Sequence, residues 1–149
     1  MSDFDFLADQ QVTQDDTAEM TLYSARLPNG KHPKLFGRFA GEANQAYTNA
    51  ILKRNHAKAK GMRARAPLAN DLTENRNQDR ELYPKHVIFG WEDVCDAEAV
   101  DQKFSPEKCK EFFLKLPDDM FDEVRNFFAD PFNFRDQIDP EEATAKGKK

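Results

Sequence analysis

GWEDVCDAEAVDQKFSPEKCKEFFLKLPDDMFDEVRNFFADPFNF, the stretch Gly90–Phe134, carries local signals that agree on one compact helical unit. Ser105 followed by Pro106 is typical of a helix start, because a serine oxygen caps unpaired backbone amides and a proline at the first helical position needs no amide proton. Pro117 is expected to end this helix. The pair Asp118–Asp119 then predicts a second helix, whose positive dipole end the two carboxylates stabilise.

Apolar residues in both predicted helices recur at helical spacing. The first stripe comprises Cys109, Phe112, Phe113 and Leu116, and the second comprises Met120, Phe121, Val124, Phe127 and Phe128. We expect the two stripes to face each other, with Phe132 and Phe134 returning to the same cluster. About seven aromatic rings within roughly thirty residues are enough for a small core.

The chain before this unit predicts a hairpin and a helix. Strand-like pieces at Met20–Leu27 and Lys34–Phe39 flank the sequence Pro28-Asn29-Gly30, which is a strong turn signal, so a β-hairpin over residues 20–39 is expected. From Glu42 to about Lys60 there is no proline or glycine, and this segment predicts a helix. Its apolar side would comprise Ala43, Ala46, Tyr47, Ala50 and Ile51.

A further helix is expected to begin at Asp71, which can act as its cap. Its apolar side would comprise Leu72, Tyr83, Val87, Ile88 and Trp91. Pro84 removes a helical hydrogen bond, so we expect either a bend near Arg80 or a new helix start at Pro84. Gly90 would end the helix.

These elements predict a mainly α protein, a small helical domain of about four to five helices with an N-terminal hairpin and flexible termini. The domain would span residues 19–136. Residues 1–18 would form an acidic arm with a short apolar patch, and residues 137–149 a charged tail. Charged residues make up 33% of the chain, which agrees with flexible parts.

The sequence lacks a recognisable catalytic, cofactor or metal motif. His32, His56 and His86 are more than twenty residues apart, and no glycine-rich phosphate loop occurs. Cys95 and Cys109 are fourteen positions apart, which fits two small buried residues better than a zinc or redox site. We therefore expect neither an enzyme nor a bound cofactor or metal.

Charge along the chain is segregated. The net charge is −5. The chain has only two cysteines, its N-terminus is acidic and no apolar run is long enough for a membrane span, so a protein of a reducing cytoplasm is expected, with no membrane contact. A basic patch lies in the middle of the chain: Lys53, Arg54, Lys58, Lys60, Arg63 and Arg65. Three interpretations stay open: a solvated helix end, a contact with an acidic partner, or nucleic-acid binding. The absence of aromatic residues in this run disfavours the last.

The order of motifs resembles the tail assembly chaperones of long-tailed (siphovirus-like) bacteriophages over about residues 36–134. The resemblance begins with Asn44 and Tyr47 in the first helix, followed by a basic connector and the sequence ELYPKHVIFGWEDV. It continues with a short acidic loop, Phe-Ser-Pro-Glu at 104–107, and Leu-Pro-Asp leading into a phenylalanine-rich helix that ends in Asn-Phe. These motifs are packing signatures without catalytic residues.

The resemblance implies an assembly factor of the bacterial host cytoplasm that binds the tape measure protein and recruits tail tube subunits. Thirteen phenylalanines exceed what so small a core hides, so some are expected to face a partner or a second copy of the chain. The expected partner-binding residues are Trp91, Phe112, Phe113, Met120, Phe121, Phe127 and Phe128. The simpler interpretation is that these side chains only pack with one another. Two other functions stay open, a structural virion protein of the neck or tail connector and a small nucleic-acid-binding regulator.

Overall fold

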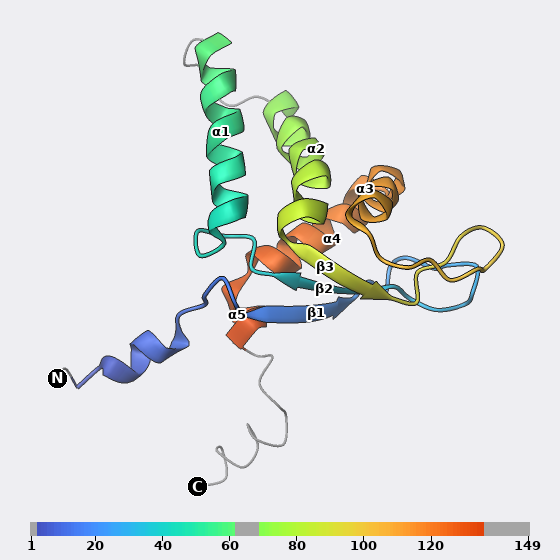
Figure 1. The fold of residues 1–149 in the computed structure, drawn as a ribbon, viewed down its shortest axis with the longest axis horizontal. Helices are drawn as coiled ribbons and strands as arrows, with labels where there is room; N and C mark the ends of the chain where they lie inside the picture. The colour runs from blue at the N-terminus through green and yellow to red at the C-terminus, as the bar shows by residue number, and fades with distance from the viewer. Residues whose placement is uncertain (1–2, 62–68, 136–149) are drawn as a thin grey trace, which may run out of the picture.

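The structure is a computed structural model that describes residues 3–61 and 69–135; for 57–61 and 69–71 it describes the backbone alone. The elements in chain order are a 3-10 helix η1 (Asp5–Gln10), strands β1 (Thr17–Thr21) and β2 (Lys34–Arg38), helices α1 (Gln45–Gly61) and α2 (Ala69–His86), strand β3 (Ile88–Glu92), and helices α3 (Pro106–Lys115), α4 (Asp118–Ala129) and α5 (Pro131–Arg135). In Figure 1 the helices α1 and α2 project side by side from the sheet, while η1 and α3 lie toward opposite ends of the molecule. Over the described residues the domain is therefore helix-dominated, as predicted, while a three-stranded antiparallel sheet in place of a hairpin alone makes it mixed α/β.

The predicted N-terminal hairpin is present, with its first strand shifted. β1 pairs antiparallel with β2 from Thr17 opposite Arg38 to Thr21 opposite Lys34. The expected strand at 20–27 instead mostly belongs to a long connection, in which the Gly30 amide donates to the Leu27 carbonyl at 2.9 Å. Gly30 has a φ of 77°, a left-handed conformation that glycine adopts without strain. The turn signal was therefore correct, although it lies inside a longer loop.

The segment after Val87 is a strand where the sequence predicted a helix. β3 pairs antiparallel with β2, with Trp91 opposite Leu35 and a bulge at Phe36/Gly37. The Val87 carbonyl also accepts the Arg38 amide at 2.8 Å, which starts this pairing. So short a run of apolar β-branched and aromatic residues can form a helix or a strand. It forms a strand here because the edge of β2 offers unpaired backbone groups.

Helix α2 also differs from its prediction in two details. It runs through Pro84 as one helix to His86, and it does not restart there. Pro84 lies in the last turn, where the helix can lose one interior hydrogen bond without being interrupted. Asp71 lies inside the helix, which begins at Ala69, so it is not the expected N-terminal cap.

Helices α3 and α4 begin where the sequence predicted. The Ser105 side chain accepts the Lys108 amide at 3.1 Å, Pro106 is the first helical residue, and α4 begins at Asp118, directly after Pro117. The two apolar stripes meet through Phe113 and Phe121, whose ring centroids are 5.0 Å apart. The same stripes also pack on other elements, because α3 contacts α2 and α4 contacts β1.

The ends of the domain partly overlap the predicted terminal segments. β1 begins at Thr17, two residues before the expected domain boundary, and Val12 in the expected arm is buried. At the other end Phe134 returns to the core as predicted, but Phe132 is exposed, because both lie on the short helix α5 and its faces diverge. The expected charged tail at 137–149 lies outside the described residues.

Candidate partner-binding surface

Three of the seven predicted partner-binding side chains lie in the core. Phe113, Phe121 and Phe128 are 0% exposed, so in this fold they cannot contact a partner, which corrects the prediction for these three. They are buried because other elements pack over their helices. Phe121 packs on Tyr83 of α2, and Phe128 lies directly against Gly37 of β2. The other four are half-buried and reach the surface: Trp91, Phe112, Met120 and Phe127.

Trp91 and Phe112 belong to one aromatic cluster at the surface. The Trp91 ring centroid lies 5.3 Å from that of Phe104 and 5.7 Å from that of Phe112, both in edge-to-face geometry. The Trp91 indole Nε1 donates to the Gln102 carbonyl at 2.8 Å, which fixes the orientation of the ring. An aromatic cluster held by both packing and a hydrogen bond presents a preformed apolar surface.

This cluster forms one wall of an open groove of about 490 Å³, which we call the Trp91–Phe112 groove. Its apolar lining comprises Pro28, Trp91, Val94, Ala97 and Phe112, and Cys95 also contributes. Charged residues of α3 stand on its border: Lys108, Glu111 and Lys115. Pro28 reaches the groove because its loop is tied to the next one, where the Asn29 side-chain amide donates to the Asp93 carbonyl at 3.3 Å. The groove is thus built from three segments that are far apart in the sequence.

The loop between β3 and α3 also lines the groove, and Asp96 determines the shape of this loop. Its Oδ1 accepts the amides of Glu98 at 3.0 Å and Val100 at 2.9 Å, and its Oδ2 accepts the Gln102 side-chain amide at 3.3 Å. A β-bridge between Cys95 and Asp101 closes the base of the loop. The Asp96 carboxylate therefore orders the loop, and since its three donors are neutral amides it also adds a negative charge to the lining of the groove.

Arg80 of α2 holds the C-terminal end of α3 in place. Its guanidinium donates to the carbonyls of Phe113 and Leu116, the latter at 2.8 Å, and to Asp118 at 2.6 Å. Its Cζ also lies 4.9 Å from the centroid of the Phe121 ring. Carbonyls at a helix C-terminus lack partners within the helix, so a buried cation there satisfies them and favours the dipole. From the sequence, Arg80 was expected only to lie near a bend in the helix.

A second polar network joins α1, α2 and α4. The buried carboxylate of Asp79 accepts the Tyr47 hydroxyl at 2.7 Å and Arg125 Nε at 2.8 Å. Arg76 donates two hydrogen bonds to Asp122, at 2.9 and 2.8 Å, and these lower the pKa of the Asp122 carboxyl. Burial raises the pKa of the Tyr47 phenol, so it stays a hydrogen-bond donor. The sequence did contain a signal for this network: Arg76 and Asp79 carry opposite charges and lie three residues apart on the predicted apolar side of α2.

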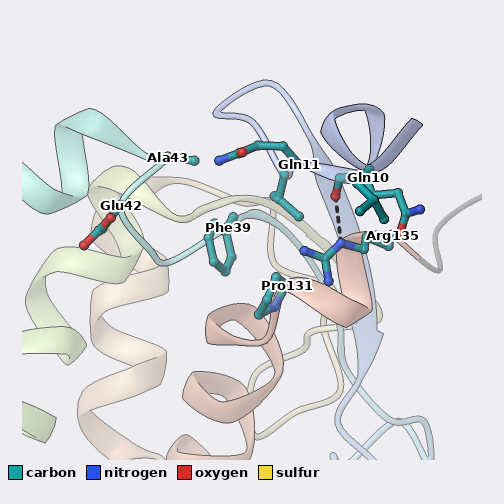
Figure 2. Close-up of a pocket in the computed structure, with 9 residues that line it drawn as sticks. Gln10, Gln11, Phe39, Glu42, Ala43, Pro131 and Arg135 are labelled. Carbon is teal, nitrogen blue, oxygen red and sulfur yellow. Dashed lines mark hydrogen bonds between the residues drawn. The ribbon is translucent and has the colours of Figure 1, made fainter. Parts of the chain in front are cut away.

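A second hollow lies beside the N-terminal segment, as Figure 2 shows. It has a volume of about 600 Å³ and lies between that segment, the loop before α1, and α5. Its lining includes Leu7, Gln10, Phe39, Pro131 and Arg135. Arg135 Nε donates to the Gln10 carbonyl at 2.7 Å across one side of it. Within the described part of the chain, no three His, Cys, Asp or Glu residues gather where they could hold a metal ion.

The predicted basic patch is described only in part. Lys53 and Arg54 are exposed on α1, and Arg54 forms an ion pair with Glu81 of α2. The side chains of Lys58 and Lys60 and the whole of Arg63 and Arg65 lie outside the described residues. The described residues therefore place only two of the six predicted cations, and they do not test the patch as a whole.

Several other apolar side chains are exposed that the sequence pattern did not identify, because exposure depends on which elements cover a helix or strand. Those on helices are Leu52, Leu72, Leu114 and Phe132, and those on the loop and sheet are Tyr23 and Phe89. Leu114 lies on α3, two residues from Phe112 but outside the groove lining. It therefore offers a matched control for experiments on the groove.

Comparison with known proteins identifies a phage family. A family model described as YdaY prophage protein matches residues 42–146, about 70% of the chain, and the matched region includes every element from α1 to α5. No curated protein and no solved structure matches the chain. None of the helices that the structure describes combines the length and apolar content needed to cross a membrane.

Proposed function

Because the chain belongs to the YdaY prophage protein family, we propose that it is a phage tail assembly chaperone, which binds the tape measure protein and recruits tail tube subunits in the bacterial host cytoplasm. Family membership establishes that the protein is phage-derived. The role in the tail is supported by the motif order of residues 36–134 and by the surface on which a client could bind.

The Trp91–Phe112 groove is the observation that carries this proposal. A tape measure protein of the kind implied by the resemblance is long and helical, with apolar stripes that need shielding before assembly. A preformed apolar groove bordered by charged side chains suits one such stripe, since the rings of Trp91 and Phe112 can contact its apolar residues and Lys108, Glu111 and Lys115 its polar edges.

The size of the groove also suits a client that must later be released. Burial of one large apolar side chain contributes about 1.5–3 kcal/mol. Two such anchors would therefore contribute about 3–6 kcal/mol, which does not exceed the entropy cost of association of about 4–15 kcal/mol, so a single groove binds weakly. We expect reversible binding by each copy, with several copies needed along one long client.

Co-expression with the tape measure protein of the same phage tests this proposal. The wild-type chain should move the tape measure protein from the insoluble to the soluble fraction. Ala97→Trp should abolish this effect, because it fills the groove from an exposed position and removes no buried contact. Leu114→Trp is the matched control, which adds an indole at an exposed site outside the groove and should leave solubilisation intact.

Circular dichroism should first confirm that both variants keep the wild-type helicity. Solubilisation by folded Ala97→Trp at the wild-type level would refute the groove as the client site. Solubilisation by neither the wild type nor any variant would refute the chaperone function itself.

Mass spectrometry of purified virions separates this proposal from a structural role. An assembly chaperone should be scarce or absent in mature particles. One copy at each symmetric position would instead identify a neck or connector protein. The gene of a chaperone is also expected to lie between the tail tube and tape measure genes.

A further inference from the structure

The Trp91 side chain borders two hollows of the surface. One is the Trp91–Phe112 groove, and the other is a hollow of about 370 Å³ whose lining also includes Asp93, Asp101 and Phe104. Trp91 and Gln102 line both hollows. Because open space adjoins the indole ring in each of them, packing alone does not hold the ring in a single position.

The backbone of Gln102 supplies the bond that fixes the ring. Trp91 Nε1 donates to the Gln102 carbonyl at 2.8 Å, and the Gln102 amide in turn donates to the Val94 carbonyl at 2.8 Å. An indole has a single N–H donor, so this bond specifies one orientation of the ring. A shift of the Gln102 backbone would move the acceptor and release the ring.

The side chain of Gln102 joins the loop between β3 and α3 to α3 itself. Its Nε2 donates to Asp96 Oδ2 at 3.3 Å and to the Val100 carbonyl at 3.1 Å, both within the loop. Its Oε1 accepts a hydrogen bond from Lys108 Nζ of α3 at 3.0 Å. The two loop partners are acceptors and the α3 partner is a donor, and a primary amide offers both functions at once.

We propose that Gln102 is a positioning residue for client binding. Its side-chain amide holds the loop against α3, and its carbonyl thereby keeps the Trp91 ring in the wall of the Trp91–Phe112 groove. Without the amide, the ring turns toward the second hollow and the groove loses its preformed wall. The consequence for the client rests on the proposed function, whereas the consequence for Trp91 does not.

The fluorescence of the purified full chain tests the effect on Trp91, because this is the only tryptophan in the sequence. Gln102→Leu removes the amide at similar side-chain size. Its emission should shift to longer wavelength, and acrylamide should quench it more strongly than the wild type, since the indole N–H becomes accessible to water. Lys108→Met removes the partner on α3 and should shift the emission in the same direction. The double variant should differ little from Gln102→Leu, because both changes act through one hydrogen bond.

The matched control is Gln14→Leu, at an exposed glutamine that does not line the groove, and its emission should equal that of the wild type. Circular dichroism and urea denaturation separate positioning from a merely structural role. A structural glutamine would lower the urea midpoint and leave the emission of the folded chain unchanged, and this result would overturn the proposal. Additive shifts in the double variant would also overturn it, because the two side chains would then act independently.

Co-expression with the tape measure protein tests the consequence for the client. A groove wall that must be ordered on binding lowers the affinity by about two- to tenfold, so Gln102→Leu should solubilise a smaller fraction than the wild type and Gln14→Leu an equal fraction. Altered Trp91 emission with solubilisation at the wild-type level would refute the role in client binding. Failure of the wild type to solubilise would refute the proposed function, while the fluorescence would still decide whether Gln102 positions Trp91.

Discussion

Arg80→Met removes the cation that holds α3 against α2, and its effect can be worked out from the contacts. Methionine keeps the unbranched apolar stem and can still pack against the Phe121 ring. It cannot donate to the carbonyls of Phe113 and Leu116 at the end of α3, nor to Asp118. Arg80 is only 5% exposed, so water does not readily replace the lost donors.

The expected loss of stability is dominated by the two carbonyls. The Leu116 carbonyl loses its donor, which costs about 1–3 kcal/mol, whereas the Phe113 carbonyl keeps the hydrogen bond from the Leu116 amide at 3.3 Å and its loss costs about 1 kcal/mol. The ion pair contributes at most about 1 kcal/mol, because the Asp118 side chain is 67% exposed and solvent screens it. The free energy of unfolding should therefore fall by about 3 kcal/mol. For a chain of this length that corresponds to a decrease in Tm of about 6–12 °C.

Urea and thermal denaturation, followed by far-UV circular dichroism, measure this loss. Arg54→Met is the matched control, because Arg54 also pairs with an acid across α1 and α2 but both partners are about 40% exposed. It should cost less than about 1 kcal/mol. If Arg80→Met were no more destabilising than Arg54→Met, the assigned role of Arg80 in capping α3 would be wrong.

Three further predictions concern other parts of the domain. Gly37→Ala should lower the free energy of unfolding by about 1–3 kcal/mol, because the new Cβ would lie 2.7 Å from Cε1 of Phe128, and an unchanged urea midpoint would contradict this close packing. Mass spectrometry after alkylation of the native protein should show rapid modification of half-buried Cys95 and protection of Cys109, whose thiol is fully buried with a raised pKa; equal rates would refute this. The folded state lowers the pKa of Asp122, so its contribution to stability is present at neutral pH and is lost on acidification below its ordinary value of 3.8. Asp122→Asn should accordingly make Tm less sensitive to pH between about 5 and 2, and an unchanged pH dependence would speak against this contribution.

The sequence by itself determined the elements whose causes are local. The start of α3 follows from the Ser105 cap and Pro106, and Pro117 with the acidic pair after it separates α3 from α4. The turn that ends at Gly30 was readable for the same reason. Each of these signals acts within one or two turns of backbone, so it has the same effect whatever packs nearby.

Only the tertiary structure determined that residues 88–92 form a strand and not a helix. Ile88 and Trp91 fit a helical stripe, but the open edge of β2 offers backbone hydrogen bonds that an added helical turn cannot match there. The choice depends on a partner strand about fifty residues earlier in the chain. A pattern read within the segment itself cannot contain that information.

The division of the aromatic residues between core and surface was likewise decided by tertiary packing. Phe112 and Phe113 are neighbours in one helix, yet Phe113 is fully buried against Phe121 of α4 and Phe112 borders the groove with Trp91. Helical periodicity showed which residues share a stripe, but the width of the covered part depends on the elements that pack over it. The groove exists because two loops and α3 converge on Trp91, and such convergence is a property of the folded chain as a whole.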